Sequence, residues 1–206
     1  MLTVEELLNV DKDNANELAG RIGKNDLPEL VELLSEKDDK LRYAALLLLK
    51  SRSARCGDVY PFWDVFRGKL KSDNSYQRSI GMMLIAENAR WDIENRLDGM
   101  LEDYFALFRD EKPITIRQSI QALYSIIPYK PVLTGAIATA LMSISIQDVK
   151  ETMRKSILLD ILEILVQIRK QKADETIDSY IFNALSGGLL DRKSKSMIEA
   201  MLRQSA

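Results

Sequence analysis

The chain has 206 residues, and its 29 Lys and Arg nearly balance its 31 Asp and Glu, so a formal net charge of −2 gives no global electrostatic reason to bind nucleic acid or an anionic membrane. It contains no histidine, which removes the commonest general base and metal ligand, and we therefore expect no enzyme, no metal and no cofactor. Cys56 is the only cysteine, so no intramolecular disulfide can form, and a reducing cytoplasmic location is expected.

Apolar residues recur at helical spacing along nearly the whole chain, and no stretch alternates with period two, which predicts an all-α fold. Residues 3–22 hold two short helical pieces, and the segment 1–25 is expected to cap the N-terminal end. From there to residue 204 the predicted helices come in five pairs: 26–35 with 39–54, 59–71 with 75–90, 96–109 with 114–127, 132–145 with 149–171, and 174–186 with 191–204.

Helix starts and the longest apolar segment refine this assignment. The uncharged stretch 131–147 is too short and too rich in Ser, Thr and Gly for a membrane span of roughly 20 residues, so we read it as a packed helix and expect no membrane partner. Three helix starts have the spacing of a capping box, or of its Asp variant. They are Thr3 with Glu6, Asp26 with Glu29, and Asp148 with Glu151.

An arginine recurs early in the second helix of four consecutive pairs. Arg42, Arg78, Arg117 and Arg154 are separated by 36, 39 and 37 residues, and Lys195 takes the corresponding place in the fifth pair. Each arginine follows a polar turn that contains Asp, and each precedes a small residue and then an apolar run. A self-similar period in this range indicates a helical solenoid.

This pattern resembles HEAT repeats, and the resemblance covers about residues 26–204. It implies a right-handed α-solenoid of about five HEAT-like antiparallel helix pairs, folded as one domain over 1–206. It also implies a structural ladder, in which the four arginines bind turn carboxylates and loop carbonyl groups within or between repeats. Two alternatives stay open: an irregular helical domain, and arginines that form a row of anion contacts.

In such solenoids the second helices line the concave face, which serves for binding. Counting along each helix from its arginine predicts the side chains on that face, and Tyr, Met and Gln with few charges suit a protein segment. We therefore predict a non-enzymatic scaffold that binds a protein partner. The predicted binding residues are Tyr43, Lys50, Met82, Gln118, Gln121 and Ser125.

The alternative function is a DNA-binding or DNA-repair protein of the HEAT-like alkylation-repair glycosylase kind. Proteins of that kind place aromatic side chains and an acid around a damaged base. Trp63 reads instead as helix packing and Trp91 as a helix end, so nucleic acid is the less favoured partner. A last polar stripe, made of Asp160, Glu163 and Gln167 in an apolar helix, is read as its solvent side rather than as a buried polar site or a metal-binding edge.

Overall fold

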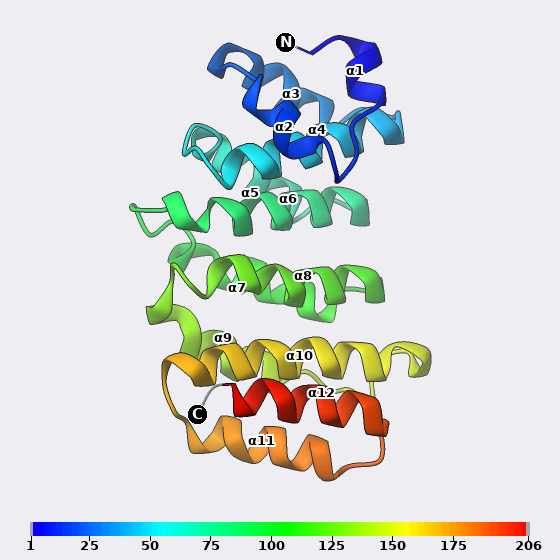
Figure 1. Ribbon diagram of the computed structural model, residues 1–206, viewed down its shortest axis with the longest axis vertical. Helices are drawn as coiled ribbons and strands as arrows, with labels where there is room; N and C mark the ends of the chain where they lie inside the picture. Colours follow the sequence, from blue (N-terminus) through cyan, green and yellow to red (C-terminus); the bar gives the residue numbers. More distant parts are fainter. Residues whose placement is uncertain (1, 205–206) are drawn as a thin grey trace. The chain divides into compact units, whose positions relative to one another are not determined.

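The computed structural model describes residues 2–204 of the chain (Figure 1). The predicted all-helical fold is confirmed, since 72% of the chain is helical and the described part contains no strand. The chain divides into two compact units, Met1–Met100 and Leu101–Ala206, where the sequence predicts a single domain. Each unit has its own set of packed helices.

The first unit is organised around helix α4. The short helices α1 and α2 pack against α4, α3 packs against α4, α5 packs against α6, and α4 also contacts α6. Its core includes Leu48 and Leu49 of α4, Phe66 and Leu84, all of them 0% exposed. The helices of this unit are α1 (Val4–Leu8), α2 (Ala15–Gly20), α3 (Leu27–Leu33), α4 (Asp39–Ser53), α5 (Trp63–Lys69) and α6 (Ser75–Asn88), with 3₁₀ turns at Lys24–Asp26, Tyr60–Phe62, Ala89–Trp91 and Asp98–Met100.

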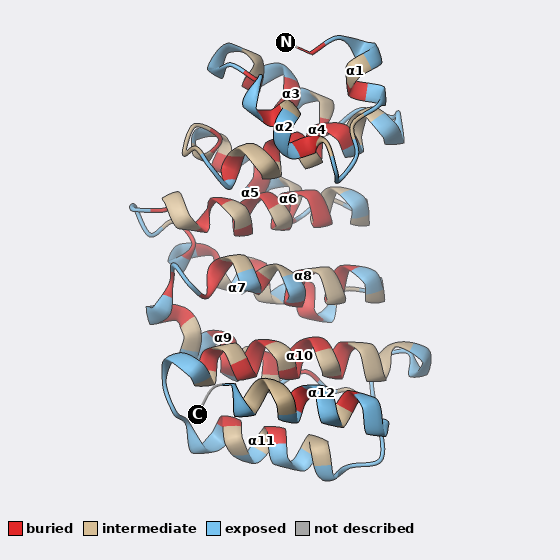
Figure 2. Ribbon diagram, in the orientation of Figure 1, coloured by how far each residue is buried: buried red, intermediate tan, exposed pale blue. Residues whose placement is uncertain are grey.

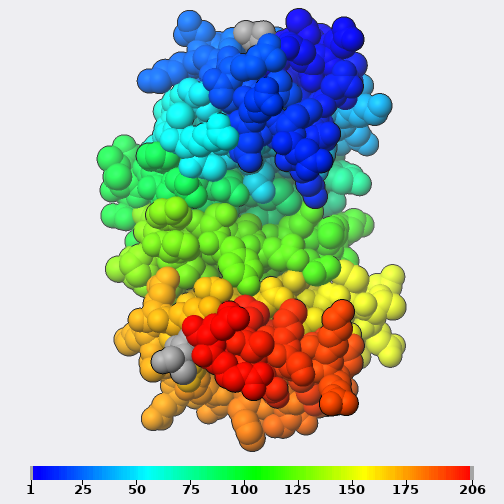
Figure 3. All heavy atoms as spheres, in the orientation of Figure 1, coloured from blue at the N-terminus to red at the C-terminus, as the bar shows by residue number. Residues whose placement is uncertain are grey.

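The second unit is organised around helix α10, which contacts α8, α9, α11 and α12. Because neighbours surround it, α10 is apolar on most of its circumference, and Figure 2 shows buried residues along much of its length. The atoms of α12, drawn in red, are prominent on the visible face of this unit (Figure 3). Its helices are α7 (Leu101–Phe105), α8 (Pro113–Ile126), α9 (Thr134–Met142), α10 (Glu151–Gln171), α11 (Glu175–Ser186) and α12 (Arg192–Arg203), with 3₁₀ turns at Ala106–Arg109 and Pro131–Leu133.

The predicted helix 96–109 is divided, and α7 begins only at Leu101. The buried carboxylate of Asp92 accepts the backbone N–H groups of Arg96 and Leu97, at 2.8 and 3.1 Å, and so holds this segment in a loop. Asn95 in that loop has a φ of 55°, in the left-handed region, which also prevents a helix from starting there.

One of the three predicted capping boxes is confirmed. The Thr3 hydroxyl accepts the Glu6 N–H at 3.2 Å, and the Glu6 carboxylate accepts the Thr3 N–H at 2.8 Å. The box at Asp26 is wrong, because that carboxylate accepts the N–H of Gly23 instead, at 2.8 Å. The box at Asp148 is also wrong, because α10 begins at Glu151 with Lys150 as its N-cap and no side-chain cap.

A glycine sets the close approach of α5 to α6. A Cβ atom at Gly81 would lie 2.4 Å from the carbonyl oxygen of Phe66 and 2.9 Å from the Cβ of Lys69. We expect Gly81→Ala to lower the free energy of unfolding by about 2 kcal/mol or more, because α5 must move away. A Cβ atom at Gly68, in α5, would meet no heavy atom within 4 Å, so Gly68→Ala should instead raise stability by about 0.5–1 kcal/mol. Urea denaturation of both variants tests this, and similar losses in the two would contradict the close approach.

Candidate functional site

The predicted binding residues lie in different environments. Tyr43 on α4 is 45% exposed, Gln121 on α8 is exposed, and Lys50, Gln118 and Ser125 are half-buried. Met82 on α6 is 0% exposed, so its side chain is not accessible to a partner in this structure. The next residue, Met83, is half-buried and lies nearer the surface than Met82.

The position of Met82 explains why it is buried. Met82 follows Arg78 by four residues, and the residues four places after the arginine in two other second helices are buried as well. They are Leu46 on α4 and Leu158 on α10, which are 8% and 6% exposed. In α8 the same place holds Gln121, which is polar and exposed. Helix α8 therefore departs from the pattern of the other second helices at this point.

Three of the four repeated arginines donate hydrogen bonds to carbonyl groups of the turn before their own helix. Arg42 Nη1 donates to the carbonyl of Glu36 at 2.7 Å, and Arg42 also pairs with Asp39. Arg78 donates to the carbonyls of Ser72 and Asp73 at 2.8 and 2.9 Å. Arg154 donates to those of Val149 and Gln147 at 3.0 and 2.7 Å, and Lys195 donates to that of Gly187 at 2.9 Å.

Arg117 behaves differently, because it reaches a carboxylate on the next second helix. Its Nε and Nη2 atoms donate to the two carboxylate oxygens of Asp160 on α10, at 2.6 and 3.1 Å. The Asp160 side chain is only 6% exposed, and Gln121 Nε2 donates a third hydrogen bond to it at 2.9 Å. A planar guanidinium holds a carboxylate well in this bidentate geometry. The expectation that Asp160 lies on the solvent side of its helix is therefore wrong.

Glu163 lies one turn further along α10 and is only half-buried. It accepts a hydrogen bond from the hydroxyl of Tyr124 on α8 at 3.2 Å, and it forms no ion pair with any described residue. Burial raises the pKa of its carboxyl group, and the charge of Asp160 raises it further, against the lowering effects of Tyr124 and Arg117. Burial and the nearby carboxylates also raise the pKa of the Tyr124 hydroxyl, so that it remains a donor.

Arg117, Gln121, Tyr124, Asp160 and Glu163 thus form one cluster, which we call the α8/α10 polar cluster. The sequence identified Arg117 and Gln121 by their register but assigned them to different roles. It also singled out Asp160 and Glu163 but read them as solvent-facing, and it missed Tyr124. The available signal was the pairing of a polar residue at a normally apolar place in α8 with an acid in the apolar run of α10.

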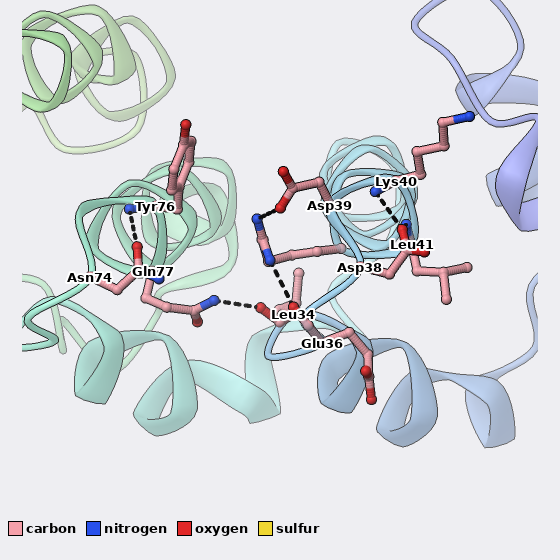
Figure 4. A network of polar contacts seen from close by, with 10 residues as sticks. Leu34, Glu36, Asp38, Asp39, Lys40, Leu41, Asn74, Tyr76 and Gln77 are labelled. Carbon is pink, nitrogen blue, oxygen red and sulfur yellow. Dashed lines mark hydrogen bonds and ion pairs between the residues drawn. The ribbon is translucent and has the colours of Figure 1, made fainter.

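In the first unit, polar side chains link the starts of α4 and α6 to the end of α3 (Figure 4). Gln77 Nε2 donates to the carbonyl of Leu34 at 2.8 Å, and the guanidinium of Arg42 lies 5.7 Å from the centre of the Tyr76 ring. Asp38 and Asn74 cap the first turns of α4 and α6 with their side chains. These contacts position the exposed ring of Tyr43 beside a well-anchored helix start.

The two tryptophans both serve the packing of the first unit. Trp63 is 1% exposed. Trp91 is half-buried, and its indole N–H donates to the carbonyl of Ser53 at 2.7 Å, while Arg90 donates to that of Ala54 at 2.6 Å. Trp91 and Arg90 together satisfy carbonyl groups that are left unpaired at the end of α4. Neither tryptophan lies free on the surface as a stacking platform for a base.

Within residues 2–204, no three acidic or cysteine side chains gather closely enough to hold a metal ion. No described helix combines the length and the apolar character that crossing a membrane would require. No protein-family model matches the chain, and no curated protein matches it in sequence.

The contact between Arg117 and Asp160 should be the strongest polar link between α8 and α10. We expect Arg117→Ala to lower the free energy of unfolding by about 2–4 kcal/mol, because it leaves a buried carboxylate without its cation. Arg154→Ala, which removes only bonds to turn carbonyls, should cost about 1–2 kcal/mol. Chemical denaturation measures both, and a double variant with Asp160→Ala should show a coupling of about 1–3 kcal/mol. Additive losses would contradict the pairing.

The raised pKa of Glu163 has a consequence for stability. The folded state binds this proton more tightly than the unfolded state does, so the charged carboxylate costs stability at neutral pH, and the cost falls as the pH drops through the raised pKa toward the ordinary value of 4.5. We expect Glu163→Gln to unfold at a higher denaturant concentration than the wild type at pH 7, with the difference vanishing near pH 4. The exposed Glu199, changed to Gln, is the control and should show no such trend. A wild type more stable than Glu163→Gln at pH 7 would contradict the assignment.

Proposed function

We propose that the chain is a non-enzymatic, HEAT-like scaffold that binds a protein partner along its second helices, and that its helix pairs form a right-handed solenoid. The packing within each unit supports this, because α4 contacts α6 in the first and α10 contacts both α8 and α12 in the second. The recurrence of turn contacts by Arg42, Arg78, Arg154 and Lys195 supports a repeated unit as well. These basic residues act as structural contacts in the proposal.

The observation that carries the proposal is the α8/α10 polar cluster. The place of Gln121 is apolar and buried in α4, α6 and α10, whereas in α8 it holds a polar, exposed side chain that is joined to Asp160. A polar network between helices adds little stability over a good apolar contact. Polar residues at places that are apolar in equivalent helices therefore tend to be found where function requires them. Gln118 and Ser125, both half-buried, extend the cluster along α8 with further hydrogen-bonding groups.

The first unit offers a more apolar face of the same kind. On α4 and α6 this face includes exposed Tyr43 and half-buried Leu47 and Met83. The Lys50 Nζ atom on α4 lies 3.6 Å from the Glu87 Oε1 atom on α6. An aromatic ring, a flexible methionine and a charged pair at the edge are typical of surfaces that bind protein segments. The environment of both tryptophans favours this partner class over nucleic acid.

A comparison of two double variants tests the function. The double variant Tyr43→Ala/Gln121→Ala truncates one side chain on the second helices of each unit. The control, Val65→Ala/Val132→Ala, truncates two exposed side chains on the first-helix side, where Val65 is 47% and Val132 is 79% exposed. Affinity purification with quantitative mass spectrometry, with and without nuclease, should show partners that the control retains and the Tyr43/Gln121 variant loses. We expect a loss of about tenfold, since removing an interface anchor costs about 1–2 kcal/mol.

Both variants must keep the wild-type circular dichroism spectrum and melting temperature for this comparison to count. Equal partner recovery from the two folded variants would overturn the proposal. Partners that disappear from every sample on nuclease treatment would favour the nucleic-acid alternative.

A further inference from the structure

We propose that the α8/α10 polar cluster recognises a basic side chain, Arg or Lys, of the protein partner, with Glu163 as its acceptor and Tyr124 beside it. This inference rests on the proposed function and adds the chemistry of the partner. It starts from how the five charged and polar groups of the cluster are already used within the second unit.

The carboxylate of Asp160 is already held by three hydrogen bonds. It accepts two hydrogen bonds from Arg117 and one from Gln121, and its charge is matched by the guanidinium. The neighbouring residues Ile161 and Ile164 of α10 are apolar and both 0% exposed. Asp160 therefore acts as the buried anchor of the cluster.

The carboxylate of Glu163 is used much less. A carboxylate has about four acceptor sites, and Glu163 receives one hydrogen bond, from Tyr124 at 3.2 Å. Arg117 is already committed to Asp160, so the cluster carries one cation and two anions and is left with an unmatched negative charge at Glu163. Because the side chain is half-buried, its charge is only partly screened by water, which makes a cationic donor the complementary group.

Tyr124 adds an aromatic component. Its side chain is 38% exposed, and its hydroxyl already points to Glu163. A guanidinium or ammonium group that binds Glu163 would lie next to this ring, where a cation–π contact is favourable. Gln121 and Gln118 supply neutral hydrogen-bonding groups on the same helix for the backbone of the partner segment. A partner with acidic side chains here would meet repulsion from the unmatched carboxylate.

A selection from a random-peptide display library tests the inference on the full chain. The wild type is compared with Glu163→Gln, Glu163→Lys and the control Glu199→Gln. Peptides selected by the wild type and by the control should be enriched in Arg or Lys at one position, the enrichment should be lost with Glu163→Gln, and Glu163→Lys should select Asp or Glu instead. Glu163→Gln keeps an acceptor for Tyr124 and removes a destabilising charge, so it should fold as the wild type does.

Affinities of one selected peptide complete the test. Replacing its Arg or Lys by Gln should weaken binding to the wild type by about tenfold or more, and binding to Glu163→Gln by less than about twofold. Selected peptides without a basic preference, equal losses on both proteins, or no selected peptide at all would overturn the inference. Those results would not contradict the proposed function, because the comparison of the Tyr43/Gln121 and Val65/Val132 variants tests partner binding whatever the charge of the partner. Displacement of the peptide by a labelled DNA duplex would overturn both.

Discussion

The carbonyl groups at helix ends and turns impose the constraint on which the rest of this structure depends. The last carbonyl groups of a helix have no partner within it, and among the packed helices of each unit these ends lie against neighbours rather than in open water. The chain satisfies them with side chains from the next pair. Gln77 donates to Leu34, Trp91 to Ser53, and Gln171 to Ile127, each from 38 to 44 residues further along the chain. Such bonds align one pair on the preceding one within each unit.

The repeated arginines serve the same need within a pair. Arg42, Arg78 and Arg154 each turn back to the carbonyl groups that precede their own helix, and a guanidinium with five donors can serve more than one of them. Lys195 serves one carbonyl group, that of Gly187 before α12. A cation at these places is thus explained by backbone hydrogen bonding, without any anionic ligand.

Local sequence patterns predicted much of this fold, and their failures have physical causes. Periodicity located nearly all helices, because burial of an apolar stripe is a local signal. The segment 96–109 failed because Asp92 binds amide groups four and five residues ahead, and no periodicity reveals such a bond. Counting from each arginine placed Tyr43 correctly on the surface but also chose Met82, which is buried. The choice between Met82 and Met83 is a rotation of one residue about the axis of α6, and it depends on how α6 packs against α4 and α5.

The α8/α10 polar cluster could not be assembled from the sequence, because its members lie on two helices whose relative rotation the sequence does not specify. The sequence nevertheless contained both unusual residues: Gln121 at a place that is apolar in the other second helices, and Asp160 within a mostly apolar segment, residues 157–168. On its own, Asp160 would carry the unfavourable burial of a charged group on its helix. With Arg117 and Gln121 both bound to it, Asp160 becomes compatible with the core, and the rotation of α8 on α10 is the one that brings these side chains together. The same rotation places the Tyr124 hydroxyl on Glu163, so the position of these two side chains follows from how the buried carboxylate is satisfied.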